Sequence, residues 1–467
     1  MEEKIPTAPA APRENQMGVL PVGRLLATMA VPMMISMLFQ AFYNIVDSIF
    51  VARISQDAMN AVSLAFPLQM LVVAVAGGTG VGMNALLSRS LGEKRQDMAD
   101  RAANTGIFLS LCSCVVFALI GVLLGRPFFL LQTRNPAIVD YGTAYIGICL
   151  GLSVACFSQF CLERLLQSTG RTGLAMASQI VGAVTNIILD PILIFGLLGA
   201  PRLEVAGAAI ATVAGQFLAA TLALILNVKC NPDIHIRAKE IRPDKQIIKE
   251  IYKIGIPSMI MQAIGSVMTF TMNRILISFT EAATAVFGAY FKLQSFIFMP
   301  DFGLNNGMVP IVSYNFGAAR PERVKKAIKL TIITAICIMT VGCILFETIP
   351  GSLLGLFSPS EEMLSIGIPA LRIIGVHLPV AGFCIIAGSV FQAIGNPVYS
   401  LIVSVCRQLV VLLPAAWLLA QTGNLTLVWF AFPIAEVMSL IMSTIFLGKT
   451  MHTANARMLA VHNHNRI

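Results

Sequence analysis

Charged residues are scarce in this chain. Of its 467 residues only 12% are Asp, Glu, Lys or Arg, while 57% are hydrophobic. A soluble domain carries roughly twice that share of charge, which excludes a soluble globular fold. The apolar residues form runs that can cross a hydrocarbon core of roughly 30 Å, a distance that takes about 20 helical residues. The short alternating segments of a membrane barrel are missing, so the sequence predicts an all-α membrane protein.

Several sequence signals are also missing. Residues 1–23 contain no apolar signal-peptide region, so we expect a cytoplasmic tail there. The 10 Cys form no C-x-x-C pair and are expected to be packing residues. Gly448-Lys-Thr450 has Ser443 where a phosphate-binding loop needs Gly, and Gly77–Gly82 lies inside an apolar run, where close helix packing explains it. With no ATP site, the pattern favours secondary transport.

Hydropathy predicts twelve spans in two sets of six. They lie near residues 25–50, 58–87, 104–125, 136–160, 173–199, 206–228, 254–279, 283–312, 329–349, 364–388, 397–420 and 425–447. The predicted organisation is two parallel six-helix lobes around a central cavity. Its parts are a cytoplasmic N-terminal tail (1–24), an N-terminal lobe (25–228), a cytoplasmic linker (229–253), a C-terminal lobe (254–447) and a cytoplasmic C-terminal tail (448–467).

The basic residues predict the orientation. With both termini in the cytoplasm, most of the 32 Lys and Arg residues lie on the cytoplasmic side. The opposite side keeps only Arg53, Arg126, Arg134, Arg202 and Arg372. This is the bias of the positive-inside rule, and it explains the net charge of +9 without a nucleic-acid partner.

An internal repeat runs through the chain. Ala30-Val-Pro32 recurs as Gly255-Ile-Pro257, and Leu166-Gln-Ser-Thr-Gly170 recurs as Phe391-Gln-Ala-Ile-Gly395, both 225 residues later. The segments that begin at Leu91-Gly and Phe316-Gly match at the same offset. Since each unit has an even number of spans, the copies enter the membrane from the same side, as in transporters that rock two lobes about a central site.

With these segments the chain resembles the MATE family of multidrug and toxic-compound extrusion transporters. The resemblance rests on Pro32, Phe39-Gln-Ala-Phe-Tyr-Asn-Ile-Val-Asp47, Gly92, Gln167–Gly170, Asn186-Ile-Ile-Leu-Asp-Pro191, Gly207-Ala-Ala-Ile-Ala-Thr212 and Gly395-Asn-Pro397. It covers nearly all of residues 25–447 and implies the bacterial branch with its ion site in the N-terminal lobe.

Ionisable residues inside spans are candidates for function because their insertion is unfavourable by about 2.5–3.5 kcal/mol. Asn186 and Asp190 share one helical face, and the resemblance implies that Asp47 faces them. Two carboxylates in a low-dielectric pocket take up a proton or share a small hard cation. The resemblance implies a coupling site for H⁺ or Na⁺ at Asp47, Asn186, Asp190 and Thr212, with the Ala208 carbonyl. The alternative is that these polar groups only form hydrogen bonds between helices.

The repeat sharpens this prediction. The positions 225 residues after Asn186 and Asp190 are Val411 and Ala415, and Asp47 falls near Met272 or Asn273. The second lobe has lost all three polar groups, so we expect coupling in the N-terminal lobe alone.

The predicted substrate cavity suits loosely specified organic cations. Its candidates are Met37, Gln40, Tyr43, Asn44, Phe66, Met261, Arg274, Lys292 and Asp301. Flexible Met and aromatic side chains adapt to varied aromatic cations. Asp301 is expected either to pair with Lys292, Arg274 or Arg407, or to act as a substrate anchor or proton relay. Glu163 and Arg164 are expected to be an interfacial pair, and His377 a buried core residue.

These observations predict a secondary antiporter of the bacterial inner membrane that exports organic cations or drugs. The only partners expected besides substrate and coupling ion are membrane lipids; we expect no cofactor and a monomer. The alternative is a flippase of lipid-linked saccharides, whose cavity needs several basic residues, here Arg274, Lys292 and Arg407. A membrane-embedded enzyme would need a catalytic cluster that the spans do not offer.

Overall fold

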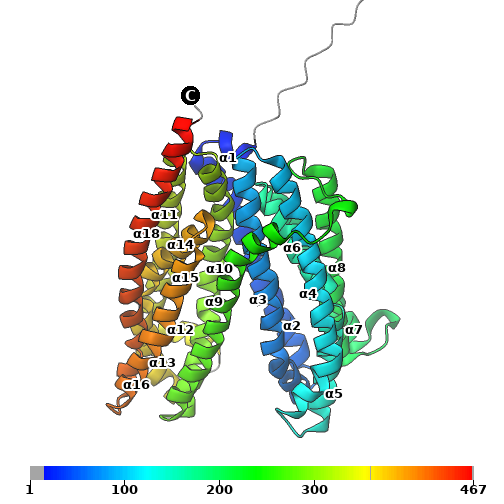
Figure 1. The fold of residues 1–467 in the computed structure, drawn as a ribbon. Helices are drawn as coiled ribbons and strands as arrows, with labels where there is room; N and C mark the ends of the chain where they lie inside the picture. The colour runs from blue at the N-terminus through cyan, green and yellow to red at the C-terminus, as the bar shows by residue number, and fades with distance from the viewer. Residues whose placement is uncertain (1–14, 358, 465–467) are drawn as a thin grey trace, which may run out of the picture.

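The computed structural model describes residues 15–357 and 359–464, with side chains up to residue 460. Every regular element in these ranges is a helix, and Figure 1 shows two bundles side by side, one from each half of the chain. Within the described residues, 10 helices are long and apolar enough to cross a membrane, or up to 12 if each of two bent pairs is one span. The predicted all-α membrane fold of two lobes is confirmed.

The first bundle follows the six spans expected in the N-terminal half. Its helices are α2 (Val22–Ala52), α3 (Gln56–Gly92), α4 (Gln96–Leu130), α5 (Pro136–Gly151), α6 (Val154–Ser168), α7 (Thr172–Phe195) and α8 (Glu204–Cys230). A short turn, η1 (Leu197–Gly199), connects α7 to α8.

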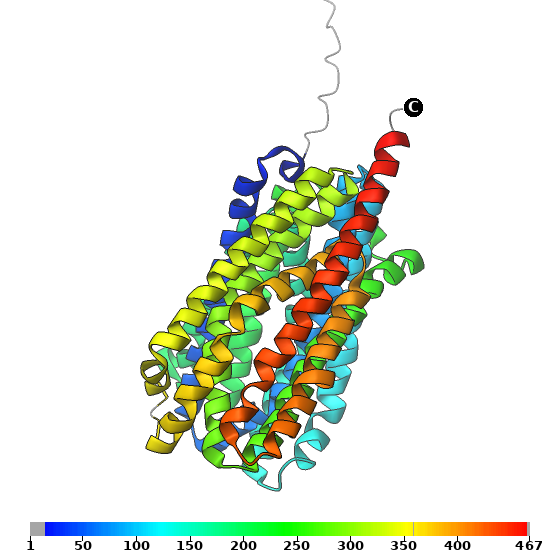
Figure 2. The ribbon, with the colours of Figure 1, turned by 90° about the vertical axis from the view of Figure 1, so that its left-hand side faces the viewer.

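The second bundle has more breaks. It comprises α9 (Lys245–Ile277), α10 (Glu281–Gly317), α11 (Pro321–Thr348), α12 (Pro350–Gly355), α13 (Glu361–Gly375), α14 (Leu378–Ile394), α15 (Pro397–Val405), η3 (Cys406–Leu412), α16 (Leu413–Ala420), α17 (Leu425–Val428) and α18 (Ala431–His464). Figure 2 shows α18 running the full height of this bundle.

Helix caps repeat at the offset of the sequence repeat. The Ser55 hydroxyl caps α3 by accepting from the Ala58 N–H at 3.0 Å, and Thr280, 225 residues later, caps α10. Asn135 caps α5 and Ser360 caps α13 in the same relation. Because a side-chain cap satisfies backbone N–H groups that have no helical partner, the same residue positions begin the same helices in both bundles.

Two predicted spans are broken, which corrects the expectation of continuous helices at 136–160 and 364–388. The axes of α5 and α6 differ by 44°, and those of α13 and α14 by 50°. Ser153, at the first break, donates to the Cys114 carbonyl at 3.2 Å. At the second break, His377 is buried and its ring Nδ1 contacts the Ile374 carbonyl. Polar side chains thus satisfy backbone groups at the breaks, and His377 has the core role predicted for it.

Four prolines inside the apolar spans are accommodated in different ways. Pro32, Pro191 and Pro257 lie inside α2, α7 and α9, which continue through them. Pro414 stands at the start of α16, directly after the π-helix η3. Proline has no N–H to donate to the helix. Among these four spans, only the eleventh changes to another backbone hydrogen-bonding pattern, the π-helix, next to its proline.

The bundles meet through glycines at one end of the molecule. A Cβ atom added to Gly82 of α3 would lie 2.1 Å from the Ile251 carbonyl oxygen of α9. One added to Gly92 would lie 2.0 Å from the Tyr314 carbonyl oxygen of α10. Only glycine permits this approach, and the predicted packing role of Gly77–Gly82 is confirmed at Gly82.

The segment around α1 (Gln16–Val19) crosses from one bundle to the other. Asn15 donates to the Thr169 carbonyl of the first bundle at 3.0 Å. Asn315 and Arg323 of the second bundle donate to the Met17 and Leu20 carbonyls at 3.1 and 2.7 Å. Residues 15–24, predicted as part of a tail, are therefore packed into the fold, and α18 similarly extends through the C-terminal segment predicted as a tail from residue 448.

The connection between the bundles is fastened to α4. It runs from the end of α8 to the start of α9 and contains the short turn η2 (Ala238–Glu240). Asn104 donates to the His235 carbonyl at 3.0 Å, and Arg101 Nε donates to Asp244 at 2.9 Å. The hydrogen bonds from Arg101 hold the pKa of Asp244 below its ordinary value.

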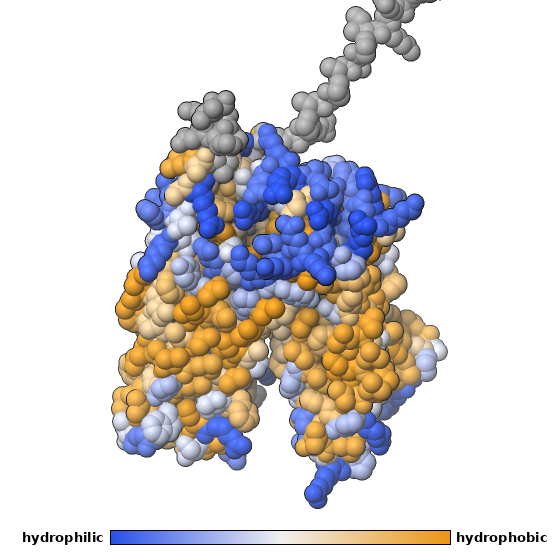
Figure 3. Space-filling model, in the orientation of Figure 1, coloured by the Kyte–Doolittle hydropathy of each residue, from blue (hydrophilic) through white to orange (hydrophobic). Residues whose placement is uncertain are grey.

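The polarity of the surface changes along the long axis of the molecule. Figure 3 shows hydrophilic residues gathered at the end where α1 and the inter-bundle connection lie, and a hydrophobic surface over the middle of both bundles. On the viewed face the molecule is hollowed between the bundles at the opposite end (Figure 3). A hydrophobic belt with one charged end suits a protein set in a bilayer.

Candidate functional site

Two buried carboxylates from different helices meet in the first bundle. Asp47 lies near the end of α2 and Asp190 lies on α7, fully buried. The two groups are electrostatic neighbours. Both oxygens of Asp190 and Oδ1 of Asp47 are buried without a hydrogen-bond partner. Asp47 and Asp190 therefore lie together, as the sequence analysis expected.

An amide and a hydroxyl extend this cluster across α7 and α8. Asn186 Nδ2 donates to Thr212 Oγ1 at 3.3 Å, while Asn186 Oδ1 has no partner. Ala208 lies one turn before Thr212 and is fully buried. The helices approach closely because Gly215 faces Gly182, where an added Cβ would lie 2.6 Å from the carbonyl oxygen. Small residues thus bring the Asn186 and Thr212 side chains into contact.

The unpartnered atoms in this cluster are all oxygens, which can take up a proton or bind a cation. Asp47, Asp190 and Asn186 each offer at least one buried oxygen with no donor. Carboxylate and amide oxygens bind protons or small hard cations. In the described part of the chain no group of three or more His, Cys, Asp or Glu forms a metal cluster. The donor set therefore fits H⁺ or Na⁺ better than a transition metal.

Tyrosines that the sequence analysis did not assign to the ion cluster surround the carboxylates. Tyr43, one turn before Asp47 on α2, interacts electrostatically with both Asp47 and Asp190. Tyr145 on α5 also lies near Asp47, and its hydroxyl accepts from Gln69 at 2.8 Å. Gln69 and Tyr145 could have been noted as polar groups inside apolar spans, but nothing in their spacing links them to Asp47.

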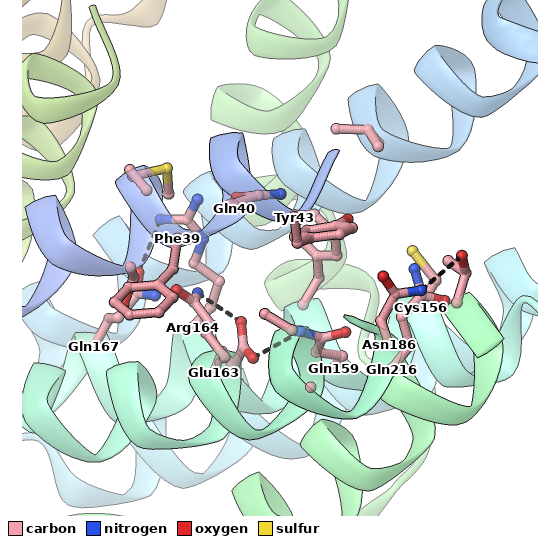
Figure 4. A pocket seen from close by; sticks show the side chains of 18 residues that line it. Phe39, Gln40, Tyr43, Cys156, Gln159, Glu163, Arg164, Gln167, Asn186 and Gln216 are labelled. Atoms are coloured by element: carbon pink, nitrogen blue, oxygen red, sulfur yellow. Dashed lines mark hydrogen bonds between the residues drawn. The ribbon is translucent and has the colours of Figure 1, made fainter. Parts of the chain in front are cut away.

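A cavity of about 130 Å³ lies beside the cluster (Figure 4). Helices α2, α6, α7 and α8 supply most of its wall, and Asn186 and Thr212 line it as well. Of the predicted substrate residues, Met37, Gln40 and Tyr43 are among its lining. The wall is rich in amides that the sequence analysis did not assign to the substrate site: Gln159, Gln167, Gln179 and Gln216.

The remaining predicted substrate residues do not line this cavity, and their place in the central cavity between the bundles stays a prediction. Asn44 and Phe66 are exposed, and Met261 is half-buried. Arg274 faces a separate hollow of about 600 Å³ and stacks on Phe270 at 5.6 Å. Lys292 lies 5.7 Å from the Phe357 ring centre.

Among the described residues, Asp301 has no ion-pair partner. It is fully buried on α10, and neither carboxylate oxygen has a hydrogen-bond partner. Arg407 instead pairs with Glu436 at 3.1 Å, with Glu436 only 3% exposed. The predicted pairing of Asp301 with Lys292, Arg274 or Arg407 is therefore wrong, because the basic residues point to other partners.

Glu163 and Arg164 also differ from the prediction of an interfacial pair. Both line the cavity, and Glu163 is 4% exposed. Its carboxylate accepts from Gln159 at 3.0 Å, as Figure 4 shows, and from Gln179 at 2.8 Å. The Arg164 guanidinium donates instead to Gln167 and, across the bundle interface, to Asn306.

Comparison with known proteins follows the same division into halves. The MatE family profile matches residues 32–192 and again 257–418. The multidrug export protein MepA of Staphylococcus haemolyticus is 28% identical over 87% of this chain and 89% of its own length. A FAD transporter of Shewanella oneidensis is 27% identical over 90% of this chain and 92% of its own length.

A solved structure agrees in three dimensions. An outward-facing multidrug resistance MATE family transporter of the MOP superfamily superposes with a TM-score of 0.89. It is 25% identical, and the match covers 96% of this chain and all of that one. With both halves matched by the family profile and nearly the whole chain matched in structure, this multi-pass inner-membrane protein belongs to the MATE family of transporters.

Proposed function

We propose that this chain is a secondary active efflux antiporter that exports organic cations in exchange for H⁺ or Na⁺. The observation that carries the proposal is the buried Asp47–Asp190 pair with its unpartnered oxygens. In a low-dielectric site, two neighbouring carboxylates do not both stay ionised without a partner. Either one of them takes up a proton or a cation binds between them. Proteins named multidrug export protein MepA, 28% identical to this chain, support the export of drugs.

The coupling ion acts on the helix that also borders the cavity. Asp47 and Tyr43 are on α2, and Tyr43 lines the cavity while interacting with both carboxylates. When H⁺ or Na⁺ neutralises the pair, with Asn186 and Thr212 as further oxygen ligands for Na⁺, the attraction of this region for a substrate cation falls. Ion uptake and substrate release are thereby linked through α2.

The membrane potential makes such exchange necessary. Moving one positive charge outward against an inside-negative potential is opposed by about 2.3 kcal/mol per 100 mV. An incoming monovalent ion cancels this term. The orientation with both termini in the cytoplasm is part of the proposal, supported by the basic residues at the end where α1 lies, and it directs the hollow of Figure 3 outward.

The test is gradient-driven efflux of a cationic dye from proteoliposomes. Wild type should move ethidium when a pH or Na⁺ gradient is imposed, and only the gradient of the true coupling ion should act. Asp47→Asn and Asp190→Asn should reduce efflux to the rate of protein-free vesicles. Asp301→Asn is the matched control, since it removes a buried carboxylate of the second bundle. Full efflux by both N-terminal variants would refute the coupling site.

Flavin nucleotides are a second candidate substrate, because a relative 27% identical to this chain is named FAD transporter. The amides of Gln159, Gln179 and Gln216 offer hydrogen bonds to the edges of a planar heterocycle. Competition by FAD for ethidium efflux distinguishes the two. A lipid-linked saccharide flippase has less support, since Arg274, Lys292 and Arg407 do not converge on one surface.

A further inference from the structure

Glu163 is a carboxylate lining the cavity that the exchange mechanism above leaves without a role. It projects from α6 and is 4% exposed, while Asp47 and Asp190 are not among the lining residues. Its two oxygens accept from neutral amides, Gln159 to Oε1 and Gln179 to Oε2. These amides fix the orientation of the carboxylate without cancelling its charge.

The adjacent guanidinium does not neutralise it by contact. Arg164 Nη1 donates to Gln167 Oε1 at 2.9 Å and to Asn306 Oδ1 at 3.0 Å. Among the described residues, no Lys, Arg or His forms an ion pair with Glu163. Arg164 is thus used at the interface with the second bundle, and Glu163 is left as a carboxyl group without an ion-pair partner, held in a fixed position beside the cavity.

The size of the cavity limits what Glu163 can receive. About 130 Å³ is less than the roughly 300–1,000 Å³ of sites that enclose drug-sized ligands. An ammonium head group fits such a space, while the rest of the molecule extends beyond it. Aromatic side chains of Phe39 and Phe160 also line the cavity, and aromatic faces attract organic cations.

We propose that Glu163 is the counter-ion that selects substrates with a protonated or quaternary amine, and that it is separate from the coupling pair Asp47–Asp190. The inference rests on the proposed efflux function and names its substrate class. Two carboxylate sites divide the work: one exchanges the driving ion, and the other recognises the charge of the cargo. Substrate and coupling ion then need not occupy the same atoms.

The experiment tests whether the carboxylate of Glu163 is needed for substrate binding, separately from ion coupling. Glu163→Gln keeps the size and shape of the side chain but removes the charge. It exchanges one accepting oxygen for a donating NH2 group, which Gln159 or Gln179 can meet with its own oxygen after an amide flip. Fluorescence binding of ethidium to the purified protein should weaken about ten-fold, because a charge-assisted contact becomes a neutral one. In proteoliposomes the KM for ethidium should rise similarly, with kcat little changed. The thermal unfolding temperature should stay near that of wild type.

A charge-relocation variant separates charge from structure. Gln159 lies one turn before Glu163 and lines the same cavity, so the double variant Gln159→Glu with Glu163→Gln returns a carboxylate to the wall. It should recover most of the ethidium affinity. Unchanged affinity in Glu163→Gln, absence of ethidium binding in wild type, or no recovery in the double variant would overturn the proposal. If ethidium binds through Glu163 yet no gradient drives its efflux, the antiport function fails and this site stands.

Discussion

The two bundles carry different chemistry at matching positions. In the first, α7 and α8 are joined by the contact between Asn186 and Thr212, close to Asp190. In the second, the corresponding pair of segments, η3 and α18, is joined by the ion pair of Arg407 and Glu436. Subtracting the repeat offset places Arg407 on Gly182 and Glu436 on Ala211, next to Thr212.

This difference supports the proposal that the duplicated scaffold couples to an ion in one half only. Arg407 supplies Glu436 with a permanent positive partner at 3.1 Å, so Glu436 has less need of a mobile cation. The first bundle has Gly182 and Ala211 at these places, and Asp47 and Asp190 have no basic partner among the described residues. A carboxylate that contacts an Arg side chain forms a structural ion pair, whereas a carboxylate without such a partner is available to a mobile H⁺ or Na⁺.

The largest expected effect comes from comparing the acids of the two bundles. Asp190→Asn should abolish gradient-driven ethidium efflux, while the double variant Arg407→Gln with Glu436→Gln, which removes both charges together, should retain most of it. The reason is that Asp190 lacks a fixed partner, whereas Glu436 has one in Arg407. Efflux rates at equal protein density in proteoliposomes give the measurement. Equal losses in both variants would mean that the bundles share the coupling.

The next effect is on stability. Arg407→Gln alone leaves Glu436 buried without its partner, and we expect a loss of about 2–3 kcal/mol, somewhat less than for a fully enclosed pair because Arg407 is 32% exposed. Thermal unfolding of the purified protein should show a lower transition temperature. Adding Glu436→Gln to this variant should restore most of the loss. An unstable double variant with a stable single variant would contradict the assignment.

Sequence reasoning reached the candidate ion site because its signals are local. Asn186 and Asp190 are four residues apart in an apolar run, and acids in such runs are rare. Resemblance supplied Asp47 and Thr212. Ion pairing between helices is not a local signal, because Arg407 and Glu436 are 29 residues apart. Only the packing of η3 against α18 shows that Arg407 pairs with Glu436 and not with Asp301.

Glu163 shows a different limit. Predicted spans placed it just beyond a continuous helix that ended near residue 160, where interfacial charges are common. The break at Leu152–Ser153 begins a second helix, α6, that extends to Ser168 and carries Glu163 into the cavity wall. No proline marks this break, so hydropathy alone could not locate it.

A smaller effect tests the ligands around the pair. Asn186→Ala removes an amide oxygen that has no partner and the donor to Thr212. If Na⁺ is the coupling ion, the concentration of Na⁺ for half-maximal efflux should rise about ten-fold, since one of few oxygen ligands is lost. Thr212→Val should raise it less. The matching changes in the second bundle, Val411→Ala and Val437→Ala, should leave it unchanged, and a shift there would contradict a single-lobe site.

The smallest effect concerns the connection between the bundles, which is fastened to the first bundle through α4. Asp244 caps α9 and accepts from Arg101 at 2.9 Å, which lowers the pKa of Asp244. A lowered folded-state pKa contributes stability above the unfolded value, near 3.9, and this is lost as pH falls through the folded value. Asp244→Asn keeps the helix cap but removes the charge, so wild type should be more stable by about 0.5 kcal/mol at pH 7. Unfolding temperatures of the two proteins should differ by a constant amount between pH 7 and about pH 5. The difference should shrink from about pH 4 downward and vanish once the pH is below the lowered folded-state pKa of Asp244. A gap that persists in acid would assign the effect to the cap rather than to the charge.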